Sequence, residues 1–144
     1  MALIDKPQLC ELIPHAGSMC LLDEVLSWDE EQIQCLTNSH LDPNNPLRNQ
    51  DGLSAIALVE YGAQAMAVHG GLVASRNGEH LDEGYLAALR DIRLKDRQVD
   101  NIASALIVEA KKIMAAQGNM IYEFSVRAND TMLVSGRATV VSNL

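Results

Sequence analysis

Hydrophobic residues recur with two different periods along this chain, and the change of period predicts its elements. Residues 54–75 are rich in Ala and other apolar residues and contain no proline, which predicts one long helix with Ser54 as its N-cap. Further along, apolar and polar residues alternate. In residues 120–128, for example, Tyr122 and Phe124 fall on one side and charged or polar residues on the other, the pattern of a half-buried strand.

Polar turns separate the remaining apolar runs. Residues 41–53 contain Asp-Pro, Asn-Asn-Pro and Asp-Gly, which are typical of a surface loop. A short helix is expected at residues 6–12. Two strands are expected before the long helix and four after it, at residues 20–29, 32–40, 85–95, 103–116, 120–128 and 131–142. The tight turns between the later strands favour antiparallel pairing.

The long predicted helix is apolar on nearly all its faces, so other elements must enclose it. A curved antiparallel sheet that folds around the helix does this with the strands available. The sequence therefore predicts one α+β domain over residues 1–144 with the hotdog architecture. Such a sheet leaves an edge strand unpaired, and pairing with a second copy would cover that edge.

Net charge excludes two classes of partner. The chain has 19 acidic and 11 basic residues and a formal net charge of -8. Nucleic acids and anionic membranes both attract basic surfaces, so neither is an expected partner. The N-terminal residues lack the basic and apolar regions of a signal peptide, and Glu60, Gln64 and His69 interrupt the most apolar helix, so we expect a cytoplasmic protein that does not span a membrane.

Three cysteines, Cys10, Cys20 and Cys35, occur without a Cys-x-x-Cys motif. Their odd number and their spacing suit neither a disulfide framework nor a zinc site, so we expect three reduced, partly buried thiols. No spacing of His, Asp and Glu resembles a set of metal ligands, so no metal is expected.

Three features of the sequence can be compared with known families: the segment "LIPHAGSMCLLDEVLSWD", the segment "VEYGAQAMA" and the pattern of the later strands. Together they resemble 3-hydroxyacyl-acyl-carrier-protein dehydratases. Within that superfamily, "NPLR", "HAGSM" and "VEYGAQAMAVHG" are most similar to a divergent branch associated with aryl-polyene-type lipid clusters. The resemblance implies a hotdog enzyme that converts 3-hydroxyacyl thioesters, carried on acyl carrier protein, to trans-2-enoyl thioesters in fatty-acid or aryl-polyene-like lipid synthesis. It implies no cofactor beyond the phosphopantetheine of the carrier protein.

One departure from the family concerns the catalytic histidine. The standard dehydratases carry it in a Gly-His-Phe-Pro-Gly segment just before the helix, where this chain has "NPLRNQDGLSA". The nearest upstream histidine is His40, which lies 20 residues before Glu60. This gap is longer than the usual one, and the longer loop would have to return His40 to the site.

Dehydration needs a base for the C2 proton, an acid for the C3 hydroxyl and a stabiliser for the charge on the thioester oxygen. Glu60, in an apolar helical setting, and His40 are the candidates for the first two roles. Gln64 lies four residues after Glu60 on the same helix face and would orient it or the substrate. The alternatives are a Glu60 on a solvated helix stripe and a His40 that is an ordinary loop histidine.

Backbone N–H groups at the start of the helix, near Ser54, Ala55 and Ile56, are the expected stabiliser of the thioester oxygen, because the helix dipole is positive there. Gly52 would let the chain approach the substrate closely.

Basic residues are the candidates for binding the acidic carrier protein and the phosphate of its arm. Arg93, Lys95 and Arg97 share one face if they lie in a strand, and Arg48 is a further candidate. The alternative is a solvated strand edge whose charges discourage aggregation.

Three further histidines are assigned other roles. His69 lies nine residues after Glu60, on the opposite helix face, which favours a packing or hydrogen-bonding role. The resemblance implies a structural role for His15, and His80 is expected to be exposed.

Two other functions remain open at this point. A hotdog thioesterase would use Glu60 to activate water and would need no histidine base. A non-catalytic hotdog subunit would stabilise an active partner. The active assembly is therefore expected to be a homodimer or a heterodimer with another hotdog protein.

Overall fold

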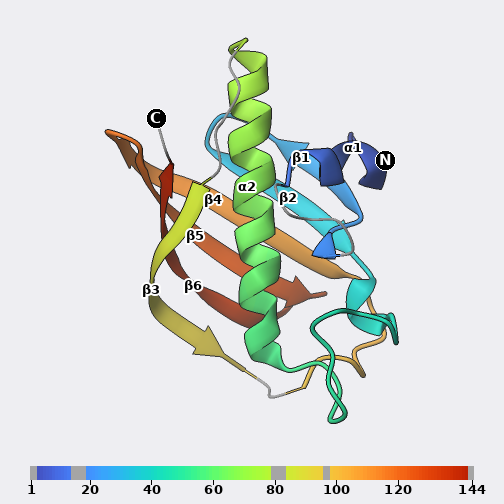
Figure 1. Ribbon diagram of the computed structural model, residues 1–144. Helices are drawn as coiled ribbons and strands as arrows, with labels where there is room; N and C mark the ends of the chain where they lie inside the picture. The colour runs from blue at the N-terminus through green and yellow to red at the C-terminus, as the bar shows by residue number, and fades with distance from the viewer. Residues whose placement is uncertain (1–2, 14–18, 79–83, 96–97, 143–144) are drawn as a thin grey trace.

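A long helix lies across one curved antiparallel sheet (Figure 1). The computed structural model describes residues 3–13, 19–78, 84–95 and 98–142. The helices are α1 (Lys6–Glu11) and α2 (Leu58–Arg76), with 3-10 turns η2 (Ser39–Leu41) and η3 (Ala55–Ala57). The strands are β1 (Glu24–Trp28), β2 (Gln32–Thr37), β3 (Gly84–Leu94), β4 (Leu106–Ala116), β5 (Asn119–Ala128) and β6 (Thr131–Ser142).

The six strands form one sheet in the order β1-β2-β4-β5-β6-β3, and every neighbouring pair is antiparallel. The α+β hotdog prediction is confirmed. Ser54 is an N-cap, as predicted, but of η3 and not of α2 itself. Its side chain accepts a hydrogen bond from Ile56 N (3.3 Å), and α2 follows η3 directly.

Alternation along the strands decides which side chains meet the helix. Ile33, Phe124 and Val126 point into the core, where they are buried with Tyr61 and other residues of α2. The helix approaches β5 so closely that a Cβ added to Gly62 would lie 2.6 Å from Phe124 Cδ2. A residue without a side chain is therefore required at this contact.

The two edges of the sheet differ. An isolated bridge between Ile4 and Val25 covers part of β1. The edge strand β3, at the left of Figure 1, pairs with β6 on one side and with no other described strand, and its Leu86, Leu89 and Leu94 are exposed. This edge is open to pairing with another chain.

His69 is a structural residue, as its position on the helix predicted. Its ring is fully buried, with Nε2 2.8 Å from Asp29 O and Nδ1 2.7 Å from Tyr122 Oη. A carbonyl only accepts, so Nε2 carries the proton and Nδ1 accepts from the tyrosine. Burial lowers the pKa of His69, which keeps the ring neutral.

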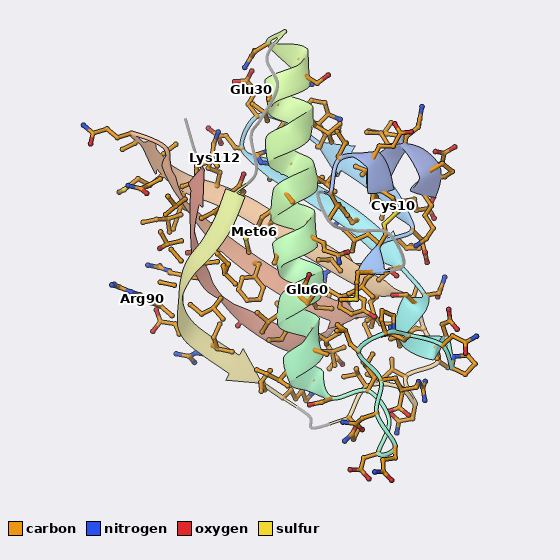
Figure 2. All side chains as sticks on the ribbon, in the orientation of Figure 1. Cys10, Glu30, Glu60, Met66, Arg90 and Lys112 are labelled. Atoms are coloured by element: carbon orange, nitrogen blue, oxygen red, sulfur yellow. A yellow bond between two sulfur atoms is a disulfide. The ribbon has the colours of Figure 1, made fainter. Side chains whose placement is uncertain are left out.

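The prediction of three reduced thiols is wrong for two of them. Cys10, on α1, forms a disulfide with Cys20 (Figure 2). Spacing along the chain gave no sign of it, because the pair forms only where the chain returns past α1. Cys35 is free and fully buried, and burial raises the pKa of its thiol to about 12. Within the described ranges, no helix is both long enough and apolar enough to cross a membrane.

Candidate active site

Glu60 lies in the first turn of α2 on a face that the sheet of its own chain does not cover (Figure 2). The next residue, Tyr61, points into the core, together with Ala65 and Val68 on the same face of the helix. Glu60 points elsewhere and is exposed in the single chain. The described residues of the isolated subunit therefore do not give it the expected apolar surroundings, and Ile56, one turn before it, is 55% exposed on the adjoining surface.

Gln64 connects this face to the two residues on either side of Cys20. Its Oε1 accepts from Leu21 N (2.8 Å), and its Nε2 donates to Met19 O (2.6 Å). The same Nε2 lies 3.4 Å from Glu60 Oε1. Gln64 is almost completely buried, so its amide is held in one orientation beside the carboxylate. The expected orienting contact with Glu60 is present.

A buried polar network on the neighbouring face of α2 fixes the loop before the helix. Tyr61 Oη accepts hydrogen bonds from Ser39 Oγ and Asn45 Nδ2, each at 2.9 Å. These residues were missed in the sequence, because no local pattern shows that a loop serine and asparagine return to the helix. The one local sign of this network in the sequence is a tyrosine directly after Glu60, because a buried tyrosine hydroxyl needs hydrogen-bond partners.

His40 is held away from solvent. Its side chain is fully buried, and Nε2 lies 2.8 Å from Ile102 O. Burial lowers the pKa of His40, against the opposing effect of the Ile102 carbonyl. Among the described residues no hydrogen bond or ion pair joins His40 to Glu60, and His40 Nδ1 has no partner there. The expected pairing is therefore not formed within the single chain.

An ion pair joins the segment before the long helix to the loop before β4. Arg48, expected to bind an anion, instead pairs with Asp100 (3.5 Å) and donates to His40 O (3.3 Å). Ala55 is buried, and the amide of Ile56 already has the Ser54 hydroxyl as an acceptor. Gly52 has φ +104°, a left-handed conformation that favours glycine.

Two of the predicted carrier-binding residues are available at the surface. Arg93, in β3, and Lys95, directly after it, are both exposed. Arg97, His15 and His80 lie outside the described residues. In the described part of the chain, no three His, Cys, Asp or Glu side chains gather into a group that could hold a metal ion.

Comparison with known proteins decides the family. The model of the ApeP-like family, described as ApeP dehydratase, matches residues 7–143. The chain belongs to the ApeP-like dehydratase family. No protein among the curated sequences matches it.

Solved structures share the fold of this ApeP-like chain. The dehydratase heterocomplex ApeI:P from Xenorhabdus doucetiae is similar with a TM-score of 0.84 at 24% identity, covering 94% of this chain and 91% of the other. The thioesterase SAV0944 of Staphylococcus aureus, in its Q32A mutant, has a TM-score of 0.62 at 9% identity, covering 84% and 93%. The thioesterase HI1161 of Haemophilus influenzae has a TM-score of 0.61 at 13% identity, covering 95% and 89%.

Proposed function

We propose that this ApeP-like chain takes part in dehydrating 3-hydroxyacyl thioesters, carried on acyl carrier protein, to trans-2-enoyl thioesters in aryl-polyene-like or fatty-acid synthesis. The observation that carries the proposal is the Glu60 carboxylate. It is exposed beside an open face of the central helix, with the buried Gln64 amide 3.4 Å away. A fixed carboxyl group at an accessible surface suits proton transfer to or from a bound substrate.

The second acid–base group is assigned to a histidine of a partner subunit. His40 is fully buried and its Nε2 is occupied by the Ile102 carbonyl, so it does not reach a substrate in this conformation. The similar solved structure, ApeI:P of Xenorhabdus doucetiae, is a dehydratase heterocomplex, which supports an assembly of this chain with a second one. The exposed β3 edge and Ile56 supply the uncovered surface that such an assembly needs.

Assembly would also change the surroundings of Glu60. A partner over this face would exclude water from the carboxylate, and electrostatic interactions strengthen when water is excluded. Backbone N–H groups near Ala55 would then stabilise the charge on the thioester oxygen. No cofactor takes part in these steps.

The carrier protein is expected to dock beside the same edge. Arg93 and Lys95 are exposed and offer positive charge on a protein of net charge -8. An acidic carrier protein and the phosphate of its arm would be attracted to such a local patch, with Arg97 as a further candidate. Arg48 is a weaker candidate, since Asp100 already pairs with it.

Thioester hydrolysis is the second candidate function. Two structural neighbours are thioesterases, and a carboxylate could activate water without a histidine, since both histidines of the described residues, His40 and His69, are buried. Product analysis separates the two reactions. Dehydration leaves the acyl group on the carrier protein with one water less, whereas hydrolysis frees it as an acid.

The test is mass spectrometry of a 3-hydroxyacyl carrier protein incubated with the chain alone and together with any hotdog protein that copurifies with it. We expect the enoyl product, and the activity to require the partner. Release of the free acid would favour the thioesterase. Equal enoyl formation by the wild-type complex and by a complex containing Glu60→Gln would identify this chain as a non-catalytic subunit.

A further inference from the structure

Asp100, which no sequence pattern singled out, contacts two segments near the candidate site. It lies in the segment before β4, and its side chain contacts the backbone of the segment before η3. Its Oδ1 accepts from Leu53 N at 3.0 Å, and its Oδ2 lies 3.5 Å from Arg48 Nη1. The Leu53 amide lowers the pKa of the Asp100 carboxyl group, so the group is charged at neutral pH.

Backbone hydrogen bonds join the same two segments as these side-chain contacts. Val99 N donates to Leu53 O at 2.9 Å, and Ser54 and Gln98 form an isolated bridge. Both the N–H and the C=O of Leu53 are therefore bound by the 98–100 segment. Leu53, two residues before the η3 turn, is therefore fixed on both sides.

Gly52 shows how closely the carboxylate fits this turn. A Cβ added to Gly52 would lie 2.5 Å from Asp100 Oδ1, and Gly52 also has φ +104°. The Asp100 side chain occupies the place where a side chain at position 52 would lie. Glycine at position 52 therefore makes room for Asp100, and the expected approach to a substrate stays a prediction.

Arg48 extends the connection to the loop that carries His40. One of its terminal nitrogens pairs with Asp100, and the other donates to His40 O at 3.3 Å. A single carboxylate thus links the loop before the helix, the turn at its start and the segment before β4.

We propose that Asp100 is a positioning residue for the dehydration, acting through Leu53 and Arg48 on the turn that presents the Ala55 amide and, one turn later, Glu60. The inference rests on the proposed function. Amides aimed at a developing oxyanion act mainly in the transition state, so a displaced turn lowers kcat more than it raises KM.

Three variants test this role in the complete two-chain assembly. Asp100→Asn keeps an oxygen for the Leu53 amide and loses the charge that faces Arg48. Asp100→Ala loses both contacts. Asp51→Ala is the matched control, because Asp51 is an exposed carboxylate of the same turn whose side chain makes no hydrogen bond or ion pair within the described part of the chain.

We expect Asp100→Ala to lower kcat roughly 10- to 100-fold with KM within about twofold of wild type, since small displacements of reacting groups have effects of this size. Asp100→Asn should recover a large part of kcat, and Asp51→Ala should match wild type. Hydrogen exchange at the Leu53 amide should accelerate in Asp100→Ala only, at a temperature where thermal melting shows every variant folded.

Wild-type kcat in Asp100→Ala, or unchanged exchange at Leu53, would overturn the inference. Equal losses in Asp100→Ala and Asp51→Ala would overturn it too. These results differ from failure of the proposed function, in which the wild-type assembly itself forms no enoyl product.

Discussion

The Cys10–Cys20 disulfide gives a stability change that can be calculated from the chain it closes. The two cysteines are separated by 10 residues. Cross-linking a loop of this length removes entropy from the unfolded chain worth about 3 kcal/mol in the loop-closure model. Other contacts keep α1 in place when the bond is absent: Leu9 is fully buried, and Lys6 Nζ donates to Leu22 O at 2.9 Å. Reduction should therefore weaken the fold without abolishing it.

Urea unfolding with and without dithiothreitol measures this difference. The oxidised protein should be more stable by about 2–3 kcal/mol. Thiol titration in denaturant should find one thiol before reduction, that of Cys35, and three after it. Cys10→Ser is the control, because its stability should not respond to the reductant. Three thiols in the untreated protein, or equal stabilities on either side of a confirmed reduction, would refute the reasoning.

Three further predictions concern the core and the site. Gly62→Ala should destabilise the fold by about 1–3 kcal/mol in urea unfolding, because its Cβ would lie 2.6 Å from the buried Phe124 ring. Stability should fall as the pH drops below 6.5, because the folded pKa of His69 is lowered and the unfolded chain then binds more protons. Gln64→Leu should destabilise by about 1–3 kcal/mol and reduce kcat, since Leu21 N loses a buried acceptor.

Each of these has its control. Gly71→Ala lies on the same helix against the flexible end of Leu12, so it should cost less than Gly62→Ala; equal losses would contradict the packing argument. His69→Gln should reduce the acid dependence between pH 6.5 and 5 and leave the part due to His40, whose pKa burial also lowers; an unchanged slope would contradict the role of His69. Gln8→Leu, at an exposed glutamine of α1, is the control for Gln64→Leu, and an equal loss in the two variants would contradict the argument from the buried contact.

The local periodicity of hydrophobic residues was sufficient to predict the helices and strands and their order along the chain. The Ala-rich stretch predicted α2, and alternation at Tyr122 and Phe124 predicted the inner face of β5, because helix and strand periods are properties of neighbouring residues. The antiparallel pairing followed from tight turns such as that at Gln117 and Gly118. These features need no knowledge of distant contacts.

Contacts between distant segments could not be predicted in this way. The disulfide depends on the return of Cys20 past α1, and the place of Asp100 depends on a loop that meets Gly52 from 48 residues further along the chain. His40 had the right residue type in a suitable loop, yet the fold buries it against Ile102. Glu60 is exposed because a single sheet cannot enclose every face of its helix.

Replacement of the Glu60 carboxylate tests the central claim most directly. Glu60→Gln keeps the size of the side chain and removes its acid–base function. In the assembly with the hotdog partner, the account predicts a fall of at least about 100-fold in the rate of enoyl formation, with unchanged affinity between the two chains. An enoyl product formed at the wild-type rate by this variant would contradict the account.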